Sequence, residues 1–449
     1  MRLPKTIVAA ALCAVAALPA RAQRDTSHAG HQMDMPGMAM PSPLLDLSMK
    51  RMGSGTTWVP EAFPLPSLHT MAGAWSVMAH GFAFVQYNHQ DGPRGDSQFG
   101  SLNWGMLMAS RPLAGGRFEA RTMLSADALT VSGRGYPLLL QSGEQYQGAA
   151  IRDRQHPHDF WMELAALYER PLSERIGLSV YAAPSGEPAL GPVAFMHRPS
   201  AMDNPFAPIG HHWQDATHVA FGVATLGVFG ERWKIEGSAF NGREPDEHRW
   251  NFDIATMDSW SGRLTVNPNE RWSLTAGYGR IAHPEATHPD DDVERITASA
   301  MRSGQIGSRG VWAATAIFGA NHAHESWTGS LLVEGEAVVD DRHTLFARVE
   351  QVEKTGEELQ LEADGVASES RFGVTALTAG YMREILSGRG TTLGIGASGT
   401  LNMVPPALRP AYGSRTPWAA AVFLRVRVRS ATGGSQGMRG HSQAAPMRR

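Results

Sequence analysis

The chain has almost no cysteine, and beyond its N-terminus it has no long apolar run. Its 449 residues include a single cysteine, Cys13, in a segment that we expect to be removed. The mature chain then has no disulfide, no thiolate metal ligand and no cysteine nucleophile. After residue 22, no stretch reaches the roughly 18 consecutive apolar residues of a membrane-spanning helix. These absences exclude a disulfide scaffold and a helical membrane protein.

An excess of charge is missing as well. The sequence has 40 Lys and Arg against 43 Asp and Glu, a formal net charge of -3, so no nucleic-acid partner is expected. It contains no phosphate-binding loop, no nucleotide fingerprint, no catalytic serine motif and no TonB-type plug domain. We therefore expect that the protein is not an enzyme.

The N-terminus indicates export. Arg2 and Lys5 precede an apolar run over residues 7–18, and Ala20-Arg21-Ala22 follows as a small-x-small cleavage site. This order is typical of a secretory signal peptide, here residues 1–22.

Two further segments differ in composition from the rest of the chain. Residues 23–72 are rich in Met, Pro, His and Ser and have little periodicity, so they predict a disordered periplasmic arm. Residues 430–449 are rich in Gly, Ser and Arg and predict a flexible basic tail. No linker divides the region between them.

Two-residue alternation fills that central region. In residues 117–125 the even positions are uncharged, while Arg117, Glu119 and Arg121 take odd positions. Successive side chains of a strand point to opposite faces, so this segment has one apolar and one charged face. From residue 73 we expect about sixteen strands of the ~10 residues that suit a transmembrane barrel. They lie near 74–87, 99–110, 116–128, 157–169, 176–184, 217–227, 232–241, 259–267, 271–281, 293–303, 310–320, 328–338, 343–354, 371–384, 391–402 and 417–428.

Short and long connections alternate between these predicted strands. The short ones hold the Pro, Gly, Asn and Asp of tight turns, as in 111–115, 267–270 and 340–342. Outer-membrane barrels have short periplasmic turns and long extracellular loops, and an even strand number puts both termini in the periplasm. An interfacial aromatic girdle is expected from Trp75, Trp104, Trp161, Trp233, Trp272 and Trp418.

The expected fold is therefore all-β, a transmembrane antiparallel barrel over residues 73–429. A soluble propeller or paired sandwiches is the alternative, because alternation alone fits both. In architecture the barrel region resembles Gram-negative outer-membrane porin-like proteins. The resemblance implies a place in the cell outer membrane, contact with outer-membrane lipid and folding by the barrel-assembly machinery. It leaves a homotrimer open.

Charged residues of the inward parity are candidates for lining the lumen. Both signs occur, and such residues tune ion selectivity in an open barrel. In a plugged barrel they would instead brace the wall, and this alternative stays open. The candidates are Arg117, Glu119, Arg121, Lys234, Glu236, Glu334, Glu336, Arg348, Glu350, Arg425 and Arg427.

Histidines gather in two long loops, 129–156 and 185–216, and in the residues just after them. Neutral imidazole and carboxylate suit Zn(II), Ni(II) or Cu(II). If the strands that carry them are near neighbours, the two groups could meet and bind metal. The alternative is structural, with His and Asp bonding loop backbone. The candidates are His156, His158 and Asp159 in one group and His211, His212 and His218 in the other.

The arm carries a third candidate site. Residues 28–40 contain two His and four Met: His28, His31, Met33, Met35, Met38 and Met40. Thioether sulfur selects Cu(I), and imidazole serves both copper states. This stretch resembles the Met/His-rich N-terminal region of the copper-resistance protein B family, themselves outer-membrane barrels, and the resemblance implies copper capture. A spacer that binds nothing is the alternative.

Three functions follow from these features. The first is a porin-like channel for small solutes or ions, filtered by the lumen charges and the two long loops. The second is a copper- or other metal-binding barrel in metal resistance. The third is a metal-dependent hydrolase at the barrel rim with a histidine base. No cofactor is certain, and copper is the one that the resemblance implies.

Overall fold

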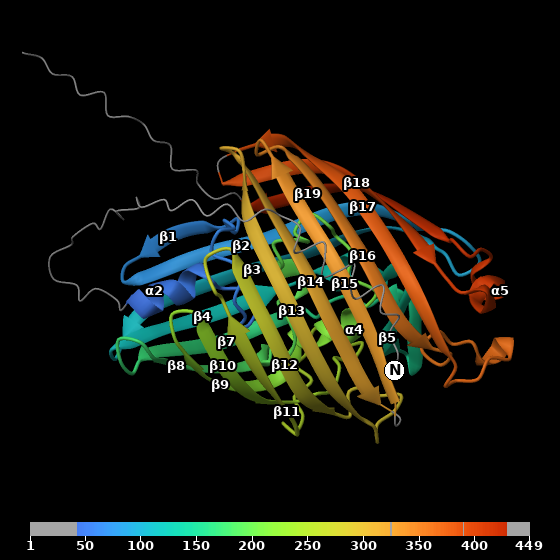
Figure 1. Ribbon diagram of the computed structural model, residues 1–449, viewed down its shortest axis with the longest axis horizontal. Helices are drawn as coiled ribbons and strands as arrows, with labels where there is room; N and C mark the ends of the chain where they lie inside the picture. The colour runs from blue at the N-terminus through green and yellow to red at the C-terminus, as the bar shows by residue number, and fades with distance from the viewer. Residues whose placement is uncertain (1–42, 324–325, 389, 429–449) are drawn as a thin grey trace, which may run out of the picture.

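A computed structural model describes residues 43–323, 326–388 and 390–428 (Figure 1). Within these residues sixteen strands close into one antiparallel barrel, which confirms the predicted fold. The barrel strands are β2 (Trp75–Gln90), β3 (Ser97–Leu113), β4 (Gly116–Leu124), β7 (Trp161–Pro171), β8 (Gly177–Gly186), β9 (Ala220–Phe229), β10 (Trp233–Phe240), β11 (Ser259–Val266), β12 (Trp272–Ala282), β13 (Asp292–Ile306), β14 (Gly310–Ala323), β15 (Ser326–Val339), β16 (His343–Thr355), β17 (Arg371–Ser387), β18 (Thr391–Met403) and β19 (Trp418–Val428).

Each barrel strand pairs with the next along the chain, and β4 pairs with β7 across an inserted hairpin. The last strand closes the ring, since β19 pairs with β2 from Gln90 to Phe82. One more strand, β1 (Leu68–Ala72), pairs with the remaining part of β2, from Ala79 to Trp75. It lies antiparallel to β2, as β19 does, so β1 continues the wall where β19 stops.

The two faces of the wall differ as the alternation predicts. In β10, Lys234 and Glu236 are buried inside, while the intervening Ile235 is 57% exposed on the outside. The outer face exposes many large apolar side chains, such as Leu226 and Val422. An apolar outer face around a polar interior is the arrangement of a transmembrane barrel.

Trp104 is an exception to the expected girdle. It lies on the inward parity of β3 and is buried in the lumen with Met106 and Met108. A girdle residue stands near a strand end on the outer face, whereas Trp104 lies in the middle of the 17-residue β3 and faces inward, so the girdle prediction is wrong for this residue.

The connections hold several short elements. They are α2 (Pro43–Lys50), α3 (Asp127–Thr130), the hairpin β5 (Tyr136–Tyr146) and β6 (Ala149–Gln155), η1 (Phe195–His197), α4 (His211–Gln214), η2 (Ala216–His218), η3 (Glu362–Asp364), η4 (Pro406–Leu408) and α5 (Arg409–Tyr412). No helix among the described residues is long and apolar enough to cross a bilayer.

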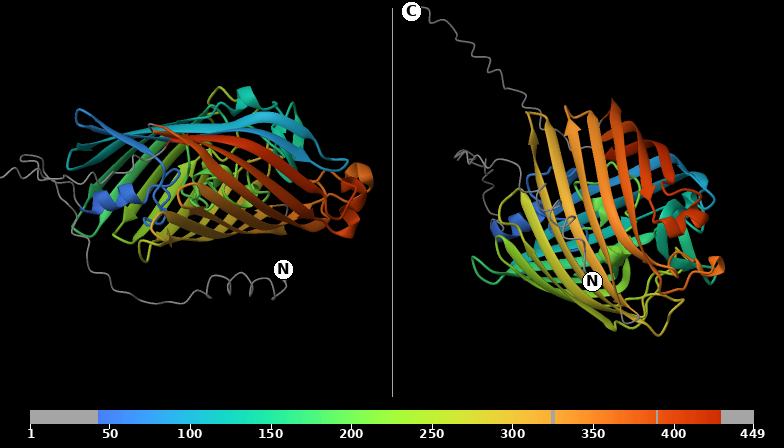
Figure 2. Two further views of the ribbon diagram at one scale, coloured as in Figure 1. Left: turned by 90° about the horizontal axis from the view of Figure 1, so that it is seen from above. Right: turned by 45° about the vertical axis from the view of Figure 1, so that its right-hand side comes forward.

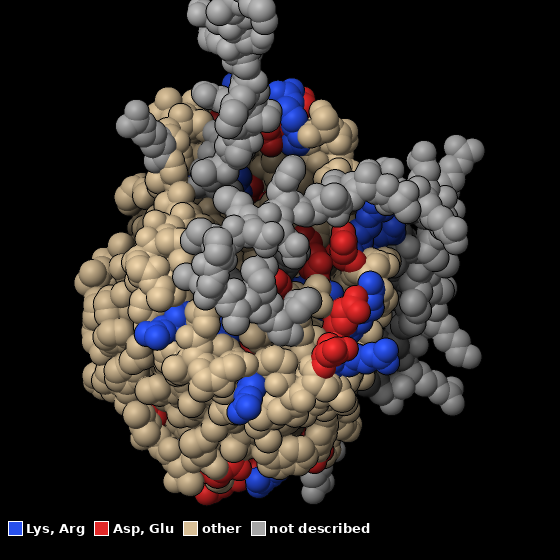
Figure 3. Space-filling view, turned by 90° about the vertical axis from the view of Figure 1, so that its left-hand side faces the viewer, with Lys and Arg blue, Asp and Glu red and all other residues tan. Residues whose placement is uncertain are grey.

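The two ends of the barrel are different. The short-turn end carries α2 and β1, on the left of Figure 1, and the long-loop end carries α5, on the right. Acidic and basic side chains lie beside one another on the described surface of the short-turn end (Figure 3). A surface hollow of about 820 Å³ lies there between α2 and the turns at 172–176 and 230–232.

Two segments fill the lumen, which we call the N-terminal insert (residues 43–67) and the loop insert (residues 187–219). The N-terminal insert, in blue, enters at the short-turn end (Figure 2). The loop insert connects β8 to β9, and most of its residues are buried. Internal cavities lined by the loop insert and the wall have volumes of only about 20 to 30 Å³.

Cations of the wall hold the N-terminal insert by its backbone. Arg117 donates to the carbonyl oxygen of Leu45 at 3.0 Å. Arg121 donates to the carbonyl of Gly55, and Lys234 to that of Thr56. The expectation of disorder across 23–72 is therefore wrong from Pro43 onward. Backbone carbonyls need no side-chain periodicity to find partners, so the sequence pattern did not show this order.

Charged groups of the opposite wall hold the loop insert. Arg348 donates to the carbonyl oxygen of Phe206 at 2.9 Å, and Glu336 accepts from the backbone N–H of Asp203 at 2.9 Å. Glu350 accepts from the N–H of Gly210 at 3.4 Å, and Arg425 pairs with Asp203.

The polar side chains expected to face water in an open lumen instead hold two inserts. The remaining expected residues also pair inside: Glu119 with Arg121, Glu236 with Lys234, Glu334 with Arg348 and Arg427 with Glu384. The described structure is therefore a filled barrel rather than an open channel.

Candidate metal centre

The two groups of loop histidines meet inside the barrel. We call His156, His158, His211, His212 and His218 the histidine cluster. The first two precede β7, and the others belong to α4 and η2 in the loop insert. Neighbouring rings in the cluster lie 5.1 to 6.4 Å apart between centroids. The convergence that the sequence left conditional is thus present.

Three of these rings surround one aromatic side chain. His218 lies 5.1 Å from His211 and 5.5 Å from His158, measured between ring centroids. Phe195 contacts all three rings, at 5.6 to 6.2 Å. Imidazoles that share one tetrahedral ion, with metal–nitrogen bonds of about 2.0 Å, have centroids roughly 5 Å apart. The separations of His218 from His211 and from His158 are close to this spacing.

Each of the three rings is oriented through its Nδ1 atom. His158 bonds Asp127 Oδ2 at 2.8 Å and His211 bonds Asp215 Oδ1 at 2.7 Å. His218 bonds the carbonyl oxygen of Asp215 at 2.8 Å. Carbonyl and carboxylate oxygens only accept, so Nδ1 must carry the proton. In the neutral ring, the free lone pair is then on Nε2, the arrangement found in metal-binding histidines.

Burial favours the neutral form of two of these rings. It lowers the pKa of His211 to about 4, although Asp215 acts in the opposite direction. Burial also lowers the pKa of His218 well below its usual value. Both imidazoles are therefore uncharged at neutral pH, which is the form that binds a metal ion.

The other candidates of the two loops face elsewhere. His156 bonds Glu144 through Nε2 at 3.0 Å, so that atom is occupied. His212 is oriented as the triad rings are, with Nδ1 at 3.1 Å from Glu244 Oε1 and a bare, buried Nε2, but its ring neighbours are His211 and His156 rather than His218. Asp159 accepts from Arg249 at 3.1 Å, and burial raises its pKa to about 7. The structure thus separates a central triad, His158, His211 and His218, from three flanking residues.

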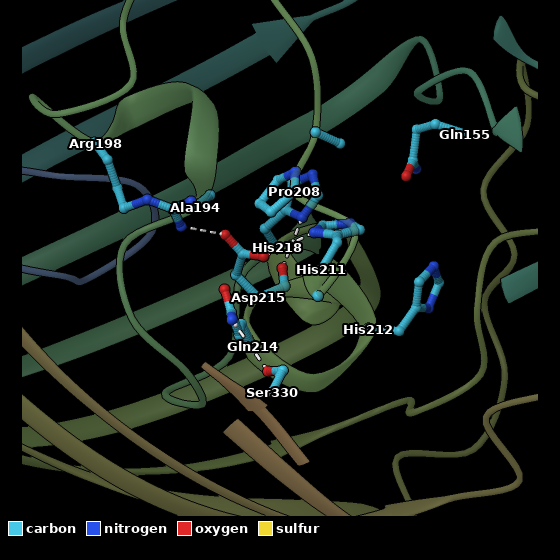
Figure 4. Close-up of polar contacts among 12 residues, drawn as sticks. Gln155, Ala194, Arg198, Pro208, His211, His212, Gln214, Asp215, His218 and Ser330 are labelled. Carbon is cyan, nitrogen blue, oxygen red and sulfur yellow. Dashed lines mark hydrogen bonds and ion pairs between the residues drawn. The ribbon is translucent and has the colours of Figure 1, made fainter. Parts of the chain in front are cut away.

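Arg198 ties the triad to the barrel wall (Figure 4). Its guanidinium bonds Asp215 and Glu334, each at 2.6 Å, and its side chain is fully buried. Asp215 therefore joins the two histidines to a cation that is itself held by β15. The helical turn α4 lies directly against β14. Gly319 of β14 permits this contact, because a Cβ there would overlap the carbonyl oxygen of Trp213.

No three His, Cys, Asp or Glu side chains among the described residues already enclose a common ion position. The triad has the ring spacing and the Nδ1 hydrogen bonds described above, but its Nε2 atoms are not placed around one ion position. The Met and His residues of the arm, 28–40, lie outside the described residues.

Sequence reasoning missed the residues that orient the triad. Asp127 is 31 positions away from His158 in the sequence, so no local spacing reveals the pair. Asp215 had a weak signal, since it stands four residues after His211 in a helical turn. Phe195 had none.

No family model matches the chain, and no curated protein matches it. Among solved structures it is similar to Salmonella typhi OmpF in complex with daunomycin, at 10% identity, over 80% of this chain and 100% of that chain, with a TM-score of 0.47. It is similar to OmpT of Vibrio cholerae at 8% identity, over 80% and 100%, with a TM-score of 0.46. An anion-selective porin from Comamonas acidovorans gives 12% identity, 79% and 99% coverage and a TM-score of 0.45. The strand pairing of the chain itself establishes the barrel.

Proposed function

We propose that the protein is an outer-membrane barrel that binds a divalent transition-metal ion of the Zn(II) or Cu(II) class inside its lumen, with both termini in the periplasm. The ligands are Nε2 of His158, His211 and His218. The observation that supports this most directly is the orientation of the three rings by hydrogen bonds at Nδ1. Three imidazoles with a fourth position left open form a common catalytic or transport-type site.

A purely structural role leaves one nitrogen of His218 unexplained. Buried polar atoms are nearly always hydrogen-bonded, and one left without a partner costs about 1–3 kcal/mol. Nε2 of His218 is buried and has no hydrogen-bond partner within the described part of the chain. A metal ion bound at Nε2 would give that atom a partner, and Nε2 of His212 is likewise buried without one among the described residues.

The filled lumen argues for binding over free diffusion. The loop insert lies inside the barrel, and its ion pairs with the wall are buried. A solute passing through would have to displace it. The arm, 28–40, remains a predicted first capture site for copper, and the homotrimer and the absence of enzyme activity stay predictions as well.

The test is metal binding by the full chain, folded in detergent micelles. All samples carry His28→Ala and His31→Ala, with the four arm methionines changed to Leu, so that the arm cannot contribute. Calorimetry with Zn(II) should show one site, and changing His211 and His218 together to Ala should lower its affinity by at least about 100-fold. Cu(II) should give an electron paramagnetic resonance spectrum with coupling to imidazole nitrogens.

Two comparison variants sharpen this test. Asp127→Asn keeps an oxygen for the N–H of Asn103 but removes the carboxylate from His158, so the affinity should fall about 10- to 100-fold. His248→Ala removes an exposed imidazole that pairs only with Asp246 and should change nothing. Equal Zn(II) affinity in the parent and the folded His211/His218 variant would contradict the proposal.

A further inference from the structure

A second group of metal-ligand side chains lies on the barrel wall beside the histidine cluster. His80 of β2 stands directly opposite Met106 of β3 in the strand register. Met106 in turn stands opposite Met123 of β4. Three consecutive strands therefore present His80, Met106 and Met123 in one row across the inner wall. We call this row, together with His197, the His–Met site.

His197 reaches the row from the loop insert. Its Nε2 lies 3.3 Å from the sulfur of Met123, and Nε2 of His80 lies 3.1 Å from the sulfur of Met106. The two imidazole rings are 5.6 Å apart between centroids. Two nitrogens and two thioether sulfurs thus face one another in pairs, although their residues come from four different segments.

These separations suit ligands of a single ion. A nitrogen at about 2.0 Å and a sulfur at about 2.3 Å from a tetrahedral ion lie roughly 3.5 Å from each other. The observed nitrogen–sulfur distances are slightly shorter, and the spacing of the two rings is close to that of the triad. A buried histidine that served only for packing would direct its nitrogen to an oxygen acceptor rather than to a weak thioether acceptor.

The surroundings are mostly apolar, although the buried Arg121 lies two residues from Met123 on the same face of β4. Trp104 packs against both imidazoles, at 5.1 Å from His80 and 4.4 Å from His197. The core around the site includes further buried methionines: Met108, Met162, Met196, Met202 and Met382. An indole face attracts a cation, and the neighbouring thioethers offer no hard oxygen ligand.

We infer that the His–Met site binds a soft monovalent cation, Cu(I) or its analogue Ag(I), through Nε2 of His80 and His197 and the sulfurs of Met106 and Met123. Thioether sulfur prefers soft ions, while imidazole accepts both soft and borderline ones. The inference goes beyond the proposed function and shares with it only the premise that the lumen receives metal ions. No electron transfer is required, because the ion binds in the state in which it arrives.

The two sites are adjacent but distinct. They meet at η1, where Phe195 contacts the triad and His197 contacts the row. In the direction of the short-turn end, Met78 and Met108 form the next opposed pair of β2 and β3. The wall therefore continues with thioethers, whereas the loop insert supplies imidazoles supported by carboxylates.

The test measures Ag(I) binding by the full chain in detergent, with the same arm substitutions in every sample. Changing Met106 and Met123 to Leu removes both sulfurs with little change in volume, a swap that cores tolerate well. This variant should lose at least about 100-fold in Ag(I) affinity and keep its Zn(II) affinity. X-ray absorption of the Cu(I)-loaded parent should show both sulfur and nitrogen neighbours.

Met301→Leu is the matched control, because Met301 is equally buried but belongs to a separate core cluster. It should bind Ag(I) like the parent. If the Met106/Met123 variant folds and binds Ag(I) as tightly as the control, the inference is wrong. A parent protein that binds Ag(I) but not Zn(II) would count against the proposed function and leave the His–Met site standing.

Discussion

The histidine cluster and the His–Met site occupy the same lumen but are built in opposite ways. The triad lies on a segment just before β7 and on two short helical turns, and each ring is fixed by an oxygen at Nδ1. The His–Met site takes three of its four ligands from the register of β2, β3 and β4. One site is positioned by hydrogen bonds, the other by the sheet itself.

This difference predicts which structural changes should weaken metal binding at each site. A carboxylate that orients an imidazole also raises its basicity, which suits a borderline divalent ion. A strand register fixes ligands without any polar partner, so soft sulfur ligands can stay in an apolar setting. Changes to the loop insert should therefore affect the triad far more than the row, and changes to strand spacing should do the reverse.

Among the substitutions that separate the two sites, Arg198→Ala should have the largest effect on metal binding. Removing Arg198 takes the guanidinium away from buried Asp215 and leaves Glu334 paired with Arg348, and breaking such a buried pair costs about 3–5 kcal/mol. The loop insert should detach, so Zn(II) binding should be lost. In a planar bilayer the variant should show conductance steps that the parent lacks.

Arg309→Ala is the control for this experiment, since Arg309 forms a surface pair with Asp340 in which both side chains are 64% exposed. It should change the free energy of unfolding by less than about 1 kcal/mol. Large steady conductance in the parent itself would contradict the filled lumen.

Gly81→Ala should lower the Ag(I) affinity of the His–Met site, with an effect of intermediate size. A Cβ at Gly81 would overlap the carbonyl oxygen of Trp104 in β3, so β2 and β3 must separate beside His80. Overpacking of this kind costs about 1–3 kcal/mol, and Ag(I) affinity should fall about tenfold while Zn(II) affinity holds.

Gly105→Ala provides an unusually close control. Gly105 is the register partner of Gly81, yet a Cβ there has no described atom within 4 Å apart from its own chain neighbours. Its Ag(I) affinity should equal that of the parent. The same loss in both variants would show that strand separation is not the cause.

The smallest effect is expected at the rim, outside both sites. A hydrogen bond with Glu285, assisted by Glu357, raises the pKa of His288 from 6.5 to about 9. The raised value means that this contact stabilises the fold fully below pH 6.5 and that the contribution disappears as the pH passes 9. Hydrogen exchange in residues 283–291 should quicken across that interval, beyond the intrinsic change.

His288→Ala should remove this pH dependence without altering the affinity for either metal ion. A change in Zn(II) or Ag(I) affinity in that variant would mean that the rim and the lumen sites are coupled, and the two-site comparison would have to include the loop that joins β12 to β13.

The barrel itself was predictable because its signal is local. Alternation at period two, as in residues 117–125, places Arg117, Glu119 and Arg121 on one face whatever the rest of the chain does. The inserts were not predictable in this way. Arg117 bonds a carbonyl 72 positions away, and Arg348 one 142 positions away. Polar side chains on the inner face show only that they need hydrogen-bond or ion-pair partners. Water in an open lumen and a segment of the chain inside the barrel would satisfy them equally.

The two candidate sites likewise combine a local signal, which the sequence shows, with long-range contacts, which it does not show. The sequence drew attention to the loop histidines through their density, but their meeting depended on how the loop insert folds. Met106 and Met123 gave no signal, since a methionine on the inward parity of a strand resembles any core residue. His80 and Trp104 were assigned to a strand and to a girdle, and only the register shows that they face the same point.

The first described stretch of the chain, residues 43–90, has a mechanical consequence. This stretch contains the N-terminal insert, which includes α2 and is held by Arg117 and Lys234, followed by β1 and β2. The N-terminal insert is therefore connected through β1 to β2, the strand that closes the barrel by pairing with β19. Tension applied to the chain ahead of Pro43 would load α2 and the insert first and reach β2 only through β1. A force on the chain ahead of Pro43 would therefore act on the N-terminal insert before it acts on the barrel wall.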